Sequence, residues 1–196
     1  MTHTAIILVS ESSISLAQRV AAELRSVIYT KNEVPGCTAI GPYAPFLKDH
    51  WQEFDAVVFI GALGICVRSI APALKNKYRD PAVVCIDSTG KFVIPVVSGH
   101  VGGANDLARR LAALLGAEAV VTTQSDNEGL WALDTLDRTY GWQVKATPAQ
   151  MNRAVFAFSR NSPRPCCSKS ATRARMPSNK PNPTTCRSSI AAKTST

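Results

Sequence analysis

The sequence of 196 residues lacks the short motifs that would place it in one of the common enzyme classes. It contains no Gly-x-Gly-x-x-Gly dinucleotide fingerprint, no phosphate-binding loop with its lysine, no His-Glu-x-x-His zinc motif and no Gly-x-Ser-x-Gly elbow. These absences argue against a nucleotide-binding enzyme, a zinc peptidase and a serine hydrolase. The function therefore has to be inferred from less common patterns.

Membrane-spanning and secretory patterns are also missing. No apolar run reaches the roughly 18 residues that a transmembrane helix needs, and the first residues lack the basic region of a signal peptide. The six cysteines form no Cys-x-x-Cys pair and no zinc-ligand spacing, and Cys66 and Cys85 lie in apolar segments typical of a core. We therefore expect a cytoplasmic protein with no membrane partner, no disulfide framework and no protein-bound metal.

Acidic residues are absent after Asp137, although the chain has 14 of them. Residues 159–196 carry eight Lys and Arg, whereas 1–158 carry 14 basic and 14 acidic residues and are neutral overall. Pro, Ser and Thr dominate this last segment and hydrophobic periodicity is lost, which predicts a disordered basic tail. One hypothesis is that it is an out-of-frame or truncated end. Basic tails bind nucleic acids non-specifically, but the neutral part has no basic face with interleaved aromatics, so we expect no nucleic-acid partner.

Ahead of this tail, strand patterns alternate with helical patterns. Apolar runs predict strands at 4–9, 55–60, 82–86, 91–97, 119–123 and 142–144. Helical spacing predicts a helix that ends at Val27 and is capped by Ser10, Ser12 or Ser13. It also predicts helices at about 45–54, 62–74 and 104–115, one that follows the polar segment 124–127 and continues to 140, and a short one from 148. Asp87-Ser88-Thr89-Gly90 predicts a hairpin turn. The order predicts an α/β, three-layer domain with a largely parallel open sheet and flanking helices. We place this domain at 1–145, the start of a linker or middle segment at 146–158, and the tail at 159–196.

The stretch FVIPVVSGHVGGANDLARR (92–110) is the centre of this arrangement. It reads as a buried strand, a glycine-rich turn and an amphipathic helix, which together expose backbone N–H groups and a positive helix end to a ligand. Ser98, His100 and Asn105 add a hydroxyl, a titratable imidazole and an amide. A tight connection with an exposed histidine is the plainer alternative. The segment Gly61–Arg68 repeats the same design.

Ligands of parallel sheets bind beyond the carboxyl ends of the strands. The unusual polar and glycine residues follow three predicted strand ends, at Ile60, Val97 and Thr123. We therefore predict that these three loops converge at one edge of the sheet and form a single site. Two helix N-termini, Arg68, Lys75 or Lys77, and His100 suit a carboxylate-bearing ligand. A surface position is an equal alternative for Arg68 and the more common one for the two lysines.

The chemistry of such a site would centre on His100 as general base for a water, with the amides of Gly102 and Gly103 receiving a developing oxyanion. Asp87 and Asp126 are the carboxylates placed to orient or replace this base, and a turn or cap role is the alternative for either. The predicted substrate-binding residues are Gly61, Gly64, Arg68, Ser98, Gly102, Gly103 and Asn105.

Three segments carry a family resemblance: GALGICVRSIAPAL (61–74), DPAVVCIDSTGKFVIPVVSGHVGGANDLA (80–108) and VVTTQSD (120–126). Together they resemble the N-terminal part of the cobalt-precorrin-5A hydrolase family (CbiG) of anaerobic cobalamin biosynthesis, over about residues 4–145. The resemblance implies hydrolysis of the ring δ-lactone of a cobalt-corrinoid with loss of acetaldehyde. The substrate is a macrocycle fringed with acetate and propionate groups, which agrees with the predicted anion site. It also carries the cobalt, so we expect no cofactor.

Two departures from the family pattern affect this reading. Residues 123–126 read Thr-Gln-Ser-Asp, where the family more usually has Thr-Ala-Thr-Asp, although Asp126 is retained. Family members also continue into a middle segment and a C-terminal domain, which 159–196 does not resemble. The alternative function is therefore a non-catalytic corrinoid- or tetrapyrrole-binding domain. Besides the macrocycle, the candidate partners are other enzymes of the corrin pathway and a second copy of the chain.

Overall fold

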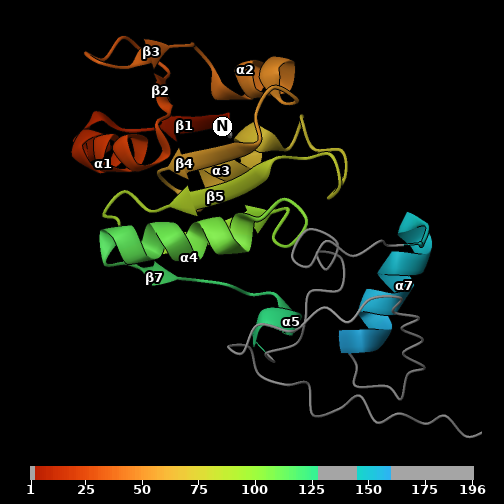
Figure 1. The fold of residues 1–196 in the computed structure, drawn as a ribbon. Coiled ribbons are helices and arrows are strands. Elements are labelled where there is room, and N and C mark those ends of the chain that lie inside the picture. The colour runs from red at the N-terminus through yellow and green to blue at the C-terminus, as the bar shows by residue number, and fades with distance from the viewer. Residues whose placement is uncertain (1–2, 128–144, 160–196) are drawn as a thin grey trace, which may run out of the picture. The chain divides into compact units, whose positions relative to one another are not determined.

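A computed structural model describes residues 3–127 and 145–159 (Figure 1). It divides into two compact units, one ending at Thr123 and the other beginning at Gln124. The first unit is built on a seven-stranded sheet in the order β3-β2-β1-β4-β5-β6-β7. None of the helices in these two described ranges is long and apolar enough to cross a membrane.

The elements alternate along the chain, as the α/β prediction requires. The strands are β1 (Thr4–Leu8), β2 (Val27–Thr30), β3 (Thr38–Ala39), β4 (Ala56–Ile60), β5 (Ala82–Ile86), β6 (Phe92–Val97) and β7 (Glu118–Ala119). The helices of the first unit are the 3-10 turn η1 (Glu11–Ser13), α1 (Ile14–Leu24), α2 (Tyr43–His50), α3 (Leu63–Ile70) and α4 (Ala104–Leu115). The second unit contains α5 (Gln124–Asn127) and α7 (Pro148–Ser159). The predicted fold class is confirmed.

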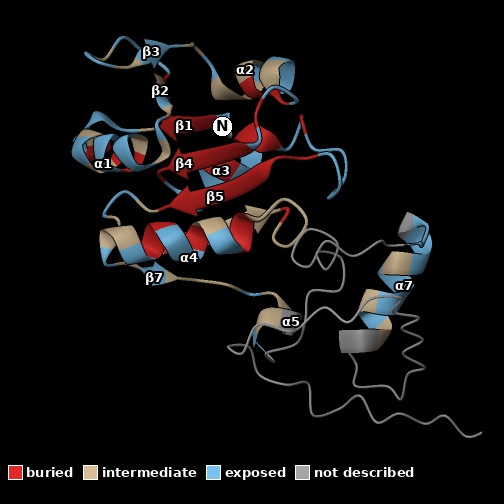
Figure 2. Ribbon diagram, viewed as in Figure 1, coloured by how far each residue is buried: buried red, intermediate tan, exposed pale blue. Residues whose placement is uncertain are grey.

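The sheet is buried on both faces, which makes the domain three-layered. Strands β1, β4 and β5 are buried along their whole length (Figure 2), and alternate residues point to opposite faces. Ile6 and Leu8 pack on one face with residues of α1 and α4, whereas Ala5 and Ile7 pack on the other with residues of α2 and α3. Near-continuous apolar runs are typical of strands covered by helices on both sides.

Two strands were not predicted from the sequence. The pattern extended the first helix to Val27, but Arg25 has φ 51° and caps the helix in the left-handed conformation, so that Val27 begins β2. Strand β3 has only two residues, too few for a periodic pattern. Strand β7 is also shorter than the predicted 119–123. The helix predicted beyond residue 127, the strand at 142–144 and the basic tail lie outside the described residues.

The direction of β6 decides where the candidate site residues lie. Strands β1 to β5 are mutually parallel, but β6 is antiparallel to β5 and β7 is parallel to β6. The predicted hairpin turn is therefore confirmed. We call the edge where β1–β5 end the carboxyl edge, and the opposite edge, where β6 ends, the loop edge. Ile86 pairs with Val93 at the carboxyl edge, and Val83 pairs with Val97 at the loop edge.

Candidate functional site

The prediction that the loops after Ile60 and Val97 converge is wrong. Because β6 runs against β4 and β5, its last residue lies beside the start of β5, at the loop edge, whereas Ile60 lies at the carboxyl edge. The two loops are separated by roughly the length of a five-residue strand, which is about 17 Å. Gly61, Gly64 and Arg68 therefore do not share a site with the loop that contains His100.

Ser98 and Gly102 form the tightly packed base of the 98–103 loop. Ser98 is buried, adopts φ 58°, and its Oγ donates a 2.9 Å hydrogen bond to the carbonyl of Asp80. A Cβ on Gly102 would lie 2.4 Å from the Ser98 Cβ and 2.8 Å from its carbonyl oxygen, so only glycine fits. The Asp80 carboxylate is itself fixed by Trp51 Nε1 at 3.0 Å and by the backbone N–H of Lys75.

Asn105 ties this loop to the end of the first unit. Its side chain is buried, and Nδ2 donates a 2.7 Å hydrogen bond to Oγ1 of Thr123. A Cβ on Gly99 would lie 2.8 Å from the Asn105 Oδ1, so the loop closes directly over this amide. The structure thus places Thr123, the last residue of the first unit, beside the loop after Val97. The convergence of the loop that follows Thr123, in the second unit, stays a prediction.

The first amides of α4 are already engaged within the loop. The N–H groups of Gly103, Ala104 and Asn105 donate to the carbonyls of His100, Ser98 and Gly99 at 3.0, 3.2 and 3.0 Å. In this conformation the Gly103 amide does not face an open oxyanion position. The loop is therefore a self-bonded turn in which Ser98, Gly102 and Asn105 have structural contacts.

His100 is half-buried on this turn and follows the strained Ser98 by two residues. Residues in sparsely populated backbone conformations cluster at functional sites, where the surroundings hold them in place. The internal bonds of the loop fix the backbone that carries the imidazole, and such support is what a positioned acid–base group requires. The geometry is compatible with the predicted role, which stays a prediction.

Asp87 lies at the other end of the hairpin, at the carboxyl edge. Its carboxylate accepts hydrogen bonds from the Thr89 N–H at 3.0 Å, from the Thr89 hydroxyl, and from the Phe92 N–H at 2.6 Å. Burial tends to raise the pKa of Asp87, but these hydrogen bonds outweigh it and hold the pKa below its ordinary value. Asp87 is therefore an ionised turn residue on the opposite edge from His100, and it cannot orient a base there.

Asp126 belongs to α5, in the second unit, and is partly exposed. The prediction that it approaches His100 stays a prediction.

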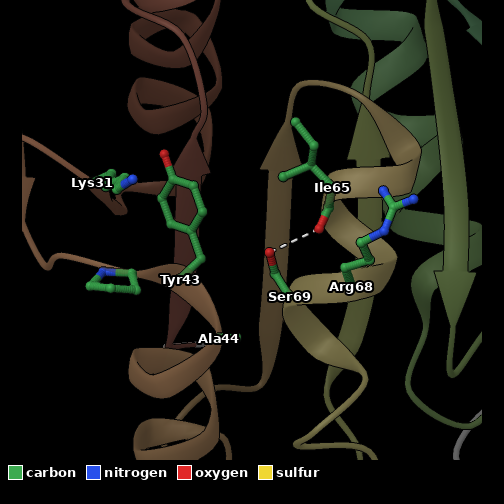
Figure 3. Close-up of a pocket in the computed structure, with 7 residues that line it drawn as sticks. Lys31, Tyr43, Ala44, Ile65, Arg68 and Ser69 are labelled. Carbon is green, nitrogen blue, oxygen red and sulfur yellow. Dashed lines mark hydrogen bonds between the residues drawn. The ribbon is translucent and has the colours of Figure 1, made fainter.

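The carboxyl edge has an open pocket of about 340 Å³ (Figure 3). Lys31 and Tyr43 lie on one side of it, and Ile65, Arg68 and Ser69 of α3 lie on the other. The pocket contains one predicted substrate-binding residue, Arg68. Lys31 and Tyr43 were not predicted, because they belong to the two strand exits that the sequence pattern did not reveal.

The walls of this pocket are held by hydrogen bonds. The Tyr43 hydroxyl donates to the Leu8 carbonyl at 3.0 Å, and burial raises the pKa of Tyr43 despite a hydrogen bond with the Lys31 backbone. Arg68 Nη1 donates to the carbonyl of Gly64 at 3.2 Å, and a Cβ at Gly64 would lie 3.3 Å from the same nitrogen. Gly64 thus leaves room for the guanidinium along the helix.

Comparison with known proteins identifies this architecture. Residues 45–126 match the family model described as cobalamin synthesis G N-terminal. The chain contains the N-terminal domain of the cobalamin synthesis G family. It is 39% identical over 154 residues to the cobalt-precorrin-5A hydrolase of Salmonella typhimurium, covering 77% of this chain and 43% of that protein. It is 44% identical over 102 residues to the cobalt-precorrin-5A hydrolase of Priestia megaterium, covering 52% and 27%.

The fold of this cobalamin synthesis G domain also resembles a solved structure, a cobalamin biosynthesis protein G homologue from Sulfolobus solfataricus. The TM-score is 0.52 with 26% identity, over 81% of this chain and 46% of the other. The chain spans less than half the length of these relatives. The family match contains α3 and the loop of His100, but it begins after Lys31 and Tyr43.

Proposed function

We propose that this chain takes part in the hydrolysis of cobalt-precorrin-5A, as the N-terminal domain of a hydrolase that opens the ring lactone and releases acetaldehyde. The observation that carries the proposal is the 39% identity over 154 residues to a protein named cobalt-precorrin-5A hydrolase. The cobalt would arrive with the macrocycle, so the chain needs no metal of its own for this proposal.

The proposed acid–base residue is His100, which removes a proton from the water that attacks the lactone carbonyl. The self-bonded loop supports this assignment, because it fixes the backbone on both sides of the imidazole. The chain leaves the first unit at Thr123, which is bonded to Asn105 at the same edge. We propose that the part of the relatives that lies beyond this chain completes the site and supplies the oxyanion donors.

Acetaldehyde release from cobalt-precorrin-5A tests this function. We would assay the chain alone and a chimera in which its first unit replaces the matching part of the Salmonella typhimurium relative. In the chimera, His100→Ala should lower the rate by about two to four orders of magnitude, since this is the usual cost of losing a general base. His50→Ala is the matched control, because His50 is also half-buried but lies at the end of α2, where it contacts Glu53. Equal rates for the two variants would refute the role of His100.

The second candidate function is non-catalytic binding of the corrinoid. It is favoured by one observation, that the Gly103 amide already donates to the carbonyl of His100 and does not face an open oxyanion position. Binding of the macrocycle by the chain alone, without acetaldehyde release even in the chimera, would select this alternative.

A further inference from the structure

The pocket between α2 and α3 lies where the order of the sheet reverses. The chain passes from β1 to β2 and β3 on one side of the sheet, and then to β4 and β5 on the other side of β1. Open α/β sheets bind ligands outside the carboxyl ends of the strands at such a switch point. Lys31 follows β2, Tyr43 begins the helix after β3, and Arg68 belongs to the helix after β4. The pocket thus collects residues from three separate strand exits.

The walls of the pocket combine two cations with apolar surface. Pro42, the Tyr43 ring, Ala44 and Ile65 supply the apolar part, and Lys31 and Arg68 supply the charge. Within the described residues, neither Lys31 nor Arg68 forms an ion pair with a carboxylate. The Tyr43 hydroxyl is held by the Leu8 carbonyl, so the ring forms a fixed wall. An apolar cavity with a few convergent polar groups is the usual form of a small-molecule site.

The nature of the donors distinguishes between two kinds of anion. Phosphate sites at helix starts use free backbone amides, but the N–H groups of Ile65 and Cys66 both donate to the carbonyl of Ala62, at 2.9 and 3.2 Å. The charged donors here are side chains on separate elements, beside aromatic and aliphatic walls. We infer that the pocket binds a carboxylate group attached to an apolar carbon skeleton, with Lys31 and Arg68 as its cations.

This site is distinct from the proposed reaction at His100. The pocket lies at the carboxyl edge and the His100 loop lies at the loop edge, with the length of β4 and β5 between them. The inference does not depend on the hydrolase proposal, because a carboxylate ligand is selected by the pocket walls alone. Two sources supply this chemistry: a peripheral acid arm of a tetrapyrrole, or a free dicarboxylic acid.

Calorimetric titration of the full chain tests the inference. The probes are uroporphyrin, which is a flat tetrapyrrole with carboxylate side chains, glutarate as a free dicarboxylate, and inorganic phosphate. The pocket variant is Lys31→Met/Arg68→Met, and the control is Lys48→Met/Arg79→Met, which removes the same charge at two exposed positions that do not line the pocket. Ala44→Leu keeps both cations but fills the cavity.

We expect uroporphyrin or glutarate to bind, and the pocket double variant to weaken that binding at least about tenfold, since each bond to a charged group is worth more than a neutral one. Ala44→Leu should weaken it as well, and the control should stay within about twofold of the unsubstituted chain.

Binding of uroporphyrin but not glutarate would identify a tetrapyrrole arm; binding of glutarate would identify a free acid. Three results would overturn the inference: no binding of either carboxylate, equal losses in the pocket and control variants, or phosphate binding as tightly as the carboxylates. His100→Ala should leave this binding unchanged while it lowers acetaldehyde release, so the two proposals can fail separately.

Discussion

The two edges of the sheet use their polar residues in opposite ways. At the loop edge, Ser98 and Asn105 are buried and hydrogen-bonded to other parts of the domain. At the pocket, Lys31 and Arg68 are exposed and face an open cavity. The 98–105 stretch, which is the most distinctive part of the sequence, thus mainly stabilises the fold. The carboxyl edge, whose sequence is less distinctive, has the charged side chains that are available to a ligand.

The largest effect should come from Gly102→Ala, because the new Cβ would lie 2.4 Å from the Ser98 Cβ in a packed turn. We expect a loss of about 3 kcal/mol in the free energy of unfolding, measured by urea denaturation. Gly103→Ala is the matched control in the same turn. Gly103 has φ 85° and open space around it, so its substitution should cost only about 1 to 2 kcal/mol of backbone strain. Equal losses would show that packing against Ser98 does not define the loop edge.

Asn105→Ala should have the next largest effect. The substitution removes a buried side chain and its hydrogen bond to the half-exposed Thr123, and the loss of such a bond typically costs about 1 to 1.5 kcal/mol. Asn76→Ala is the control, because Asn76 is exposed and its Oδ1 accepts a hydrogen bond from the nearby Tyr78 N–H. If both variants unfold at the same urea concentration, the tie between the loop and the end of the first unit contributes little.

Much of this architecture follows from the sequence, and the failures have identifiable causes. The apolar runs of β1, β4, β5 and β6 predicted four strands, because buried strands differ sharply from turns in composition. Strands β2 and β3 were missed, since one follows a helix cap at Arg25 and the other has two residues. Without β2 and β3, the strand exits that carry Lys31 and Tyr43 were not recognised, and the pocket could not be predicted.

The single-site prediction failed for a different reason. The hairpin turn after β5 was correctly predicted. However, the prediction did not take into account that this turn reverses the direction of β6 and therefore places the loop after Val97 at the opposite edge. The polar residues after Ile60, Val97 and Thr123 were all assigned to one edge, which holds only when the strands that precede them are parallel. The hydrogen bond from the Ser98 hydroxyl to the Asp80 carbonyl joins segments that are distant in the sequence, so no local sequence pattern predicts it.

Asp87 should make stability depend on pH, although it lies at the carboxyl edge. Its folded pKa is lowered, so its contribution is fully present above the unfolded pKa of about 4 and is lost as the pH falls through the folded value. The difference in unfolding free energy between the unsubstituted chain and Asp87→Ala should be about 1 kcal/mol or less at pH 7, after solvent screening. It should narrow between about pH 5 and 3. Asp49→Ala, which removes an exposed carboxylate on α2, is the control. An equal change with pH in the control, or a gap for Asp87→Ala that widens on acidification, would contradict the assignment.

The smallest effect on stability should come from Lys31→Met and Arg68→Met. Both side chains are exposed, so each substitution should change the unfolding free energy by no more than about 0.5 kcal/mol. Thermal denaturation of the two single variants beside Gly102→Ala would measure this directly. A loss approaching that of Gly102→Ala would mean that the pocket cations hold α2 and α3 together, and the contrast between the edges would disappear.

The reversal at β6 also has a consequence for the order in which the chain folds. Parallel neighbours such as β4 and β5 can pair only after the intervening segment 61–81 has returned the chain to the start of the sheet, and closing this long connection costs conformational entropy. Strands β5 and β6 are joined by residues 87–91 alone and can pair early, with α4 following directly in the chain. Segments with short sequence separations between contacts form fastest. We therefore expect residues 82–115 to form a local nucleus, with the addition of β1, β2 and β4 along the free side of β5 as the slow step of folding.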